Sequence, residues 1–323
     1  MPTLPSTLSD SKPRRRRIIG RHTGKARGPL VVCFGGMHGN EPAGVRALTL
    51  MMKMLEVEPI ANPKFRFRGR LLALRGNARA LARRRRFIHR DLNRMWTPDN
   101  VQRIRATDPE QLDEEELEIL ENLQLLEAEL WDYQPRQMIV LDLHTTTAHG
   151  GIFSIATDDP ESVRIAVELH APVITGLLEG ITGTSLHYFC SKNFGLPVTA
   201  VCFESGQHRE PLSVNRAIAA ITNCLRSVGC VRAEDVENQH DRLLVEYSQG
   251  LPRVARLLYA HHIRPDDQFR MQLGFKNFDP VSKGDLLAKD RNGPIYAKQN
   301  GLILMPLYQK RGSDGFFIVE QKV

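Results

Sequence analysis

The sequence predicts an α/β fold in which a mixed sheet is flanked by helices and is followed by a smaller C-terminal β domain. Apolar runs typical of buried strands alternate with amphipathic helical patterns over roughly the first 240 residues, as in layered α/β domains. Beyond about residue 237, short apolar runs separated by Gly, Asn and Pro take over. At 323 residues, the chain has room for two domains at about 100–200 residues each. We divide it into a flexible basic arm (1–25), a main domain (26–240) and a C-terminal β domain (241–323).

The first elements of the main domain follow from apolar spacing. Leu30–Phe34 and Phe65–Leu74 are apolar runs that predict buried strands. The segment from Glu41 to about Leu55 has helical spacing and begins near Pro42, a residue type favoured in the first helical turn. Asp113–Tyr133 predicts a long helix, because it combines regularly spaced leucines with acidic residues in its first turns. We expect the acidic face of this helix to be solvated.

The remaining elements continue both patterns. In the main domain they are the strands Met138–Leu143, Gly150–Ala156 and Pro197–Phe203 and the helices Pro160–His170 and Pro211–Val228. In the C-terminal domain, four short runs predict antiparallel strands with tight turns between them: Asp285–Ala288, Pro294–Ala297, Leu302–Met305 and Phe316–Val319, with turns at 291–293 and 299–301.

Composition points to a globular protein of a reducing compartment. Hydrophobic residues make up 41% and charged residues 25% of the chain. No stretch approaches the roughly 18 apolar residues of a membrane span, and the N-terminus lacks the apolar region of a secretory signal. The five cysteines form no CxxC pair. We therefore expect a cytoplasmic protein without a membrane partner, in which the cysteines pack as small apolar residues.

The net charge of +7 raises the question of a nucleic-acid partner. Arginine runs occur at Arg14–Arg17 and at Arg83–Arg86, and such runs often mark phosphate-binding surfaces. Residues 1–13, however, are rich in Ser, Pro and Thr, so the first run fits a solvated arm. The second run fits a charged face beside an anion-binding pocket. Because no stacking platform, zinc-finger spacing or nucleic-acid module accompanies the charge, we do not expect nucleic-acid binding.

His38 and Glu41 are three residues apart, directly after the first predicted strand. An imidazole and a carboxylate at this spacing lie on one side of a helical turn and can reach the same cation at about 2.0–2.2 Å. An isolated HxxE pattern arises often by chance, so its position is what matters. His144 ends another buried-looking strand, and ligands of open α/β sheets bind at such strand ends. His38, Glu41 and His144 would hold one zinc ion per chain and leave a coordination position for water.

Two further segments add catalytic and binding groups. The segment 86–96 is dense in arginine and amide donors, and an arginine fork grips carboxylates through two parallel hydrogen bonds. This segment therefore predicts an anionic substrate. The run 198–203 delivers Glu204 to a strand end. A glutamate that lies beside zinc-bound water without ligating the metal is the expected general base.

Together, four motifs resemble the aspartoacylase/succinylglutamate desuccinylase family of zinc carboxypeptidase-like hydrolases. They are HGNE at 38–41, RDLNR at 90–94, DLHTTT at 142–147 and FESGQ at 203–207. The resemblance runs from about Pro29 to about Arg216, with a weaker echo near 293–298. It implies a zinc-carboxypeptidase-like sheet and a zinc amidohydrolase that removes an acyl group from a small, carboxylate-bearing N-acyl amino acid or a related acylated amine.

The resemblance also implies roles for single residues. Glu204 would act as the catalytic acid/base and Arg86 would polarise the scissile carbonyl. Asn93 and Arg94 would hold the carboxylate of the substrate. Tyr296 matches a substrate-contacting tyrosine of the family only loosely, because its flanking sequence differs. In this family a C-terminal β domain borders the mouth of the active site and excludes peptides, and a homo-oligomer would be compatible with the resemblance.

Several alternatives stay open at this stage. The same site would suit a zinc carboxypeptidase acting on peptide C-termini, and the arginine-rich surface would suit a non-catalytic protein that binds RNA or another polyanion. Asp142 is either a partner of a zinc-binding histidine or a structural hydrogen-bonding group at its strand end. His149, His187 and His208 are further histidines near the motifs, but none completes a better metal site.

Overall fold

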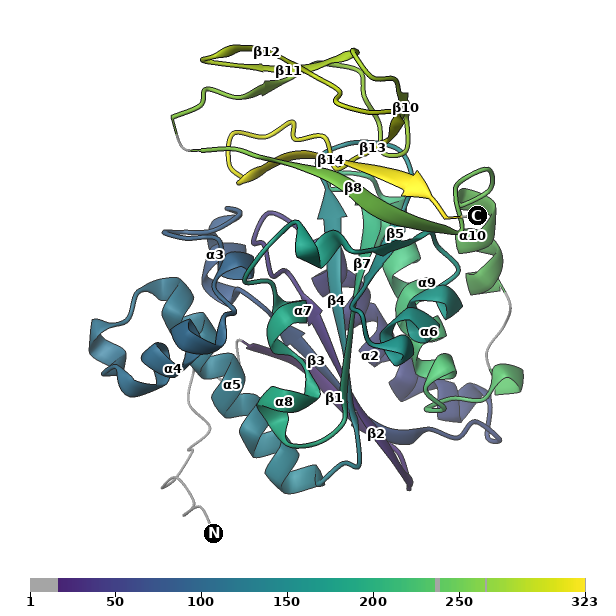
Figure 1. The fold of residues 1–323 in the computed structure, drawn as a ribbon. Helices are drawn as coiled ribbons and strands as arrows, with labels where there is room; N and C mark the ends of the chain where they lie inside the picture. The colour runs from purple at the N-terminus through teal and green to yellow at the C-terminus, as the bar shows by residue number, and fades with distance from the viewer. Residues whose placement is uncertain (1–16, 236–238, 265, 323) are drawn as a thin grey trace.

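The structure is a computed structural model that describes residues 17–235, 239–264 and 266–322. It is built around one eleven-stranded mixed sheet, with a three-stranded sheet at the C-terminal end (Figure 1). The strands in chain order are β1 (Ile18–Thr23), β2 (Ala26–Gly35), β3 (Arg68–Arg75), β4 (Met138–Thr146), β5 (Phe153–Ala156), β6 (Val173–Thr175), β7 (Val198–Gln207), β8 (Val254–His262), β9 (Arg270–Met271), β10 (Pro280–Val281), β11 (Leu286–Asp290), β12 (Gly293–Tyr296), β13 (Gly301–Leu304) and β14 (Asp314–Gln321).

The four strands β3, β2, β4 and β7 form the parallel centre of the large sheet. Their register places Gly35 opposite Leu143 and His144 opposite Glu204. All nine residues of β4 are buried, which explains why its sequence is a nearly continuous apolar run. Since the central strands run in parallel and in this register, their carboxyl ends meet at one edge of the sheet. The α/β fold with a mixed sheet is thus confirmed.

Helices cover both faces of the sheet and enclose two apolar cores (Figure 1). One face packs against α2 (Ala43–Ala61), α6 (Pro160–Glu168), α9 (Leu212–Ser227) and α10 (Gln239–Tyr247). The other face packs against α4 (Pro98–Ala106), α5 (Glu114–Tyr133), α7 (Ser185–Tyr188) and α8 (Ser191–Phe194), and α3 (Ala78–Arg83) lies beside α5. None of the helices in the described part of the chain is both long and apolar enough to cross a membrane.

The C-terminal strands extend the large sheet. β8 pairs in parallel with β6, and β14, β13 and β10 follow it as antiparallel neighbours. The remaining strands form the small sheet β12-β11-β9, which shares a third apolar core with the end of the large sheet. The four runs predicted as antiparallel strands correspond to β11, β12, β13 and β14. The strand β8, which follows the predicted boundary at residue 240, is hydrogen-bonded to β6, which precedes it. The division into separate domains therefore stays a prediction.

The N-terminal segment corrects one expectation. Residues 18–23, which we assigned to a flexible arm, form the edge strand β1 antiparallel to β3. Arg17, which we expected to be solvated, is 1% exposed and lies 2.5 Å from both Glu118 and Glu121. The ion pairs with Glu118 and Glu121 explain why the Arg17 side chain is buried although the neighbouring sequence is rich in arginine. Arg14 to Arg16 and the rest of the predicted arm before them lie outside the described residues.

The acidic face of α5 corrects a second expectation. Glu115, Glu118 and Glu129 are buried rather than solvated. Glu118 accepts hydrogen bonds from the backbone N–H groups of Ala78 and Arg79, at 3.0 and 3.1 Å. Glu115 accepts hydrogen bonds from the N–H groups of Ile88 and His89, at 2.7 and 3.0 Å. These carboxylates therefore hold the segment between β3 and α4, which includes the arginine-rich motif.

We expect Glu118→Ala to lower the free energy of unfolding by about 3–5 kcal/mol, because it removes the fully buried partner of Arg17 and leaves the backbone N–H groups of Ala78 and Arg79 without their acceptor. Glu127→Ala is the matched control on the same helix, since Glu127 is exposed and pairs with Arg105 at the surface. Surface pairs contribute at most about 1 kcal/mol. Urea titration of both variants checks the difference; equal midpoints would show that the Glu118 network does not stabilise the fold.

Candidate active site

The polar residues of the motifs meet at the carboxyl ends of the parallel strands. His38 and Glu41 follow β2, His144 belongs to β4, and Glu204 belongs to β7. The turn between β2 and α2 requires its glycines. Gly36 has a φ of +71°, and a Cβ at Gly39 would lie 2.2 Å from the backbone carbon of Ala80. The tight glycine turn brings His38 and Glu41 close to the ends of β4 and β7.

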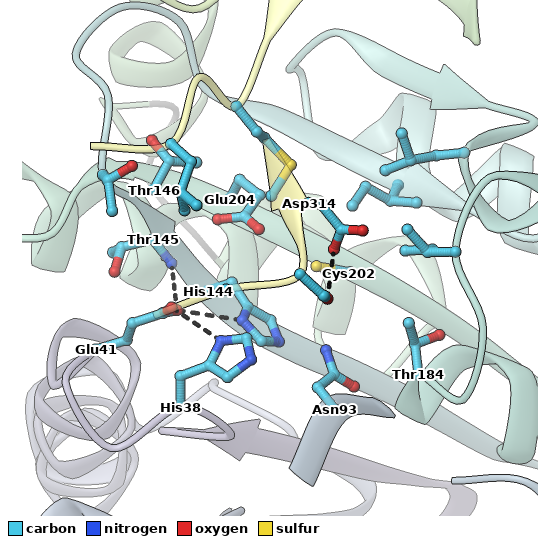
Figure 2. Close-up of a pocket in the computed structure, with 18 of the residues that line it drawn as sticks. His38, Glu41, Asn93, His144, Thr145, Thr146, Thr184, Cys202, Glu204 and Asp314 are labelled. Carbon is cyan, nitrogen blue, oxygen red and sulfur yellow. Dashed lines mark hydrogen bonds and ion pairs between the residues drawn. The ribbon is translucent and has the colours of Figure 1, made fainter. Parts of the chain in front are cut away.

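His38, Glu41 and His144 form one buried cluster (Figure 2). The Nδ1 atom of His38 lies 2.9 Å from Oε1 of Glu41, and the Nδ1 atom of His144 lies 3.2 Å from Oε2 of Glu41. The backbone N–H of Thr145 donates to the same Oε2 at 2.9 Å and fixes the carboxylate. Both imidazoles therefore turn the same nitrogen, Nδ1, toward one carboxylate.

The outer nitrogen of each histidine faces a second carboxylate. Nε2 of His38 lies 3.1 Å from Oδ1 of Asp91, and Nε2 of His144 lies 3.1 Å from Oδ2 of Asp142. A carboxylate behind a histidine fixes its tautomer and strengthens its other nitrogen as a metal ligand. The Asp142 carboxylate accepts a hydrogen bond from Ser185 at 2.5 Å, as the structural alternative predicted, and its role behind a zinc-binding histidine stays a prediction. Sequence reasoning did not single out Asp91, although it stands inside the RDLNR motif.

Charges in the cluster stabilise one another. Burial alone would raise the pKa of Glu41, but the neighbouring His38 and hydrogen bonds to both histidines hold this pKa well below its usual range. Burial likewise opposes ionisation of Asp91, and the nearby Arg86 and His38 hold the pKa of Asp91 well below normal. Glu41 and Asp91 are therefore carboxylates at neutral pH.

The donor set fits a metal ion. The candidate ligand atoms of His38, Glu41 and His144 all lie within 4.8 Å of one another, so the cluster could bind a metal ion. Two imidazoles and one carboxylate suit zinc, and three protein ligands are the number typical of catalytic zinc sites. The three residues predicted from the sequence as metal ligands thus lie together in one buried cluster.

Glu204 stands beside this cluster without belonging to it. Its side chain is buried, and Oε2 has no hydrogen-bond partner among the described residues. Burial raises the pKa of Glu204 to about 8, and the charges of Glu41 and Asp142 add to the rise while His144 and Arg86 oppose it. A carboxyl group whose affinity for protons is raised in this way can both accept and return a proton near neutral pH.

The arginine-rich motif contributes three side chains to the same pocket. Arg86 lies 2.9 Å from Asp91 and 3.6 Å from Glu41. Asn93 accepts a hydrogen bond from the backbone N–H of Ser185 at 2.8 Å, so its amide group is held in place. Arg94 pairs with Asp314, at the start of β14. All of the predicted catalytic and binding residues except one therefore line the pocket or its metal cluster.

Tyr296 is the exception, and its expected place in the site is not found. It lies on β12 of the small sheet, is 51% exposed and does not line the pocket. The residues after β13 reach the pocket instead, through Met305, Leu307, Gln309 and Asp314. Tyr296 is kept away from the pocket because β12 is an edge strand of the small sheet, where it pairs with β11. The loose sequence match around Tyr296 therefore does not correspond to a residue of the site.

Three other histidines lie outside the metal cluster. His149 is exposed, and His187 contacts the Thr184 hydroxyl through Nδ1 at the start of α7. His208 lines the pocket and contacts the Thr145 hydroxyl through Nδ1 at 2.7 Å. Burial lowers the pKa of His208, so its imidazole is neutral at pH 7. None of the three approaches Glu41 as His38 and His144 do.

Comparison with known proteins agrees with this geometry. The model of the succinylglutamate desuccinylase/aspartoacylase catalytic domain matches residues 27–227. A probable aspartoacylase from Nostoc sp. (strain PCC 7120) is 29% identical over 306 residues, which cover 86% of this chain and 90% of that protein. The succinylglutamate desuccinylase of Pseudomonas putida (strain KT2440) is 27% identical over 274 residues, covering 79% and 71%.

Solved structures share the fold. The ectoine utilization protein EutE (DoeB) from Ruegeria pomeroyi superposes with a TM-score of 0.63 at 19% identity, covering 93% of this chain and 88% of that one. Succinylglutamate desuccinylase from Vibrio cholerae superposes with a TM-score of 0.61 at 20% identity, covering 92% and 82%. These likenesses extend over both the main sheet and the C-terminal strands.

Proposed function

The chain belongs to the succinylglutamate desuccinylase/aspartoacylase family of amide-bond hydrolases, and on that premise we propose that it is a zinc-dependent deacylase. Its substrate would be a small N-acyl amino acid or a related acylated amine that carries a carboxylate. One observation carries the proposal: Glu204, whose buried Oε2 has no hydrogen-bond partner among the described residues, lies in one pocket with two histidines and a glutamate that could hold a metal ion.

His38, Glu41 and His144 would hold the ion in place of the protons that now join both Nδ1 atoms to Glu41, and Asp91 and Asp142, which lie beside the Nε2 atoms, would orient the two imidazoles. When bound, zinc supplies a Lewis acid that polarises a carbonyl oxygen and lowers the pKa of water to about 7. The Thr145 N–H and the two histidines hold the Glu41 carboxylate, which would reduce the rearrangement needed when the ion binds.

Glu204 would move the protons. Its carboxylate would accept a proton from the attacking water and then donate that proton to the departing amine. Because none of the described residues forms a hydrogen bond with Oε2, this oxygen is available to the reactants. General acid–base catalysis of this type contributes roughly 10²–10⁴-fold to the rate. The products would be a carboxylic acid and a free amine, so the reaction consumes water and returns Glu204 to the carboxylate form in which it began.

Arg86 and Arg94 would place the substrate. Arg86, held by Asp91 close to the metal cluster, would donate hydrogen bonds to the scissile carbonyl oxygen as negative charge develops there. Arg94 and the Asn93 amide would bind the substrate carboxylate and thereby fix the distance to the scissile bond. Residues after β13 border the same pocket, which supports small substrates over long peptides.

The direct test follows free-amine release by mass spectrometry from N-acetyl, N-succinyl and N-formyl amino acids and from short peptides, using the zinc-loaded protein. We expect the protein to hydrolyse one class of N-acyl amino acids and to leave blocked peptides intact. Cleavage of C-terminal residues from blocked oligopeptides would instead favour a carboxypeptidase.

Arg94→Ala is expected to raise KM by about 10–100-fold with a much smaller change in kcat, because hydrogen bonds to charged groups contribute about 1.5–3 kcal/mol. Steady-state kinetics with a hydrolysed substrate measure both constants. Arg85→Ala is the matched control, since Arg85 is exposed, belongs to the neighbouring arginine run and does not line the pocket. An unchanged KM in Arg94→Ala would remove Arg94 from carboxylate binding.

A further inference from the structure

The described residues that line the pocket provide few positive charges beyond the metal cluster. The two arginines are Arg86 and Arg94, and both already face carboxylates of the protein. Arg86 lies next to Asp91 and Glu41, where the reacting carbonyl would be. Arg94 is thus the one arginine of the lining that is placed to receive a carboxylate away from the reacting bond.

Asp314 changes what Arg94 can bind. This carboxylate lies in the pocket (Figure 2). Its side chain is 11% exposed and pairs with Nη2 of Arg94. His262 contacts Oδ1 of Asp314 through Nδ1 at 3.0 Å, and the Ser313 hydroxyl donates to Oδ2, the oxygen that pairs with Arg94, at 3.3 Å. Asp314 is therefore fixed in place, and its negative charge stands beside the only arginine available for a substrate carboxylate in this lining.

One part of the wall is apolar, and the polar residues of the remaining lining add no further arginine or lysine. Side chains from β5, from the segment between β6 and α7, from α7 and from β14 supply the apolar part: Ile155, Leu177, Leu178, Ile181, Leu186 and Phe317. Most of these side chains also belong to the apolar core on this face of the sheet or pack against it, so the wall is rigid. A charged group of a ligand that reached this wall would lose water and gain no opposite charge.

From this arrangement we infer that the substrate carries a single carboxylate and that its acyl chain and amino-acid side chain are uncharged and apolar. The inference rests on the proposed deacylase function and names its substrate class. Arg94 binds the one carboxylate. A second carboxylate, on either the acyl group or the side chain, would lie against Asp314 or the apolar part of the wall and find no positive charge. Because a charged group left unpaired in a pocket strongly lowers kcat/KM for the substrate that carries it, such a substrate is rejected. Asp314 is thus a specificity-determining residue.

Two pairs of isosteric substrates test the inference. N-acetyl-L-leucine and N-acetyl-L-aspartate differ in replacing an isopropyl group with a carboxylate on the amino-acid side. N-(4-methylpentanoyl)-L-leucine and N-succinyl-L-leucine differ in the same way on the acyl side. We expect kcat/KM to favour the uncharged member of both pairs by about 100-fold or more, the scale of discrimination against an unpaired buried charge. Equal values, or a preference for either dicarboxylate, would overturn the inference while leaving the deacylase function in place.

A variant links the preference to Asp314. Asp314→Asn keeps the shape of the side chain and removes its charge, so we expect the preference for the uncharged member to fall by about tenfold or more. Asp132→Asn is the control, because Asp132 also pairs with an arginine but lies exposed at the end of α5. The ratio of the two kcat/KM values is the readout, since a loss of folded protein lowers both values alike. An unchanged ratio in Asp314→Asn would show that Asp314 does not set specificity. Hydrolysis of none of the four compounds, together with hydrolysis of a dicarboxylate from the wider panel, would overturn the inference and leave the deacylase function in place.

Discussion

Glu204→Gln is expected to lower kcat by about 10²–10⁴-fold while the protein retains its zinc. Glutamine has nearly the same shape but cannot accept a proton from water or return one to the amine. Since Oε2 of Glu204 has no hydrogen-bond partner within the described protein, the substitution breaks no contact of that oxygen. Kinetics and metal analysis of the same preparation measure both quantities. Retained activity would show that another group moves the proton, and lost zinc would make Glu204 a metal ligand.

The stability of this variant provides its folding control. The folded-state pKa of Glu204 is raised to about 8, above that of an exposed glutamate near 4.5. The folded protein therefore binds this proton more tightly than the unfolded chain, so Glu204 reduces stability progressively as pH rises from about 4.5 to 8. In metal-free protein at pH 8, we expect Glu204→Gln to melt no lower than the wild type. A lower Tm would mean that lost activity reflects damage to the fold.

His38→Ala is expected to reduce bound zinc from about one ion per chain to below about a tenth and to abolish turnover, because two remaining ligands do not hold a catalytic ion. Asp91, the carboxylate behind His38, keeps its pairing with Arg86 in this variant, so the surrounding fold should persist. Metal analysis after dialysis checks the stoichiometry, and circular dichroism checks the fold.

The control for His38→Ala is His149→Ala, which removes an exposed histidine near the end of β4 that lies outside the metal cluster. Zinc content and turnover should match the wild type in this variant. If His38→Ala kept a full complement of zinc and its activity, the ligand set would have to be sought elsewhere in the chain.

The sequence was sufficient to predict the centre of the fold because a strand that is buried on both faces has a recognisable apolar sequence. The strands β2, β4 and β7 are buried along nearly their whole length, so they read as apolar runs whose ends are visible. His38, His144 and Glu204 stand at or just past those ends. Polar residues at the end of such a run are the signal that located the metal cluster and the general base.

Other features left no comparable trace. The strand β1 is short and only partly buried, and it adjoins an arginine run, so its pairing with β3 was not evident. The apolar periodicity of α5 predicted its apolar side but not the burial of Glu115, Glu118 and Glu129. The partners of these glutamates lie 25 to 108 residues away in the chain. The pairing of Arg94 with Asp314 spans 220 residues and belongs to no local motif. Such contacts depend on how distant segments pack, which spacing alone does not specify.

The most direct test of the account is the effect of reversible metal removal on deacylation by the wild-type protein. Amine release from N-acetyl-L-leucine, or from the best substrate of the panel, would be measured before treatment with a chelator, after it and after zinc is restored. The account predicts that activity disappears as the metal content falls to zero and returns with about one zinc ion per chain. Undiminished hydrolysis by protein shown to be metal-free would contradict it, because the cluster of His38, Glu41 and His144 would then have no part in the reaction.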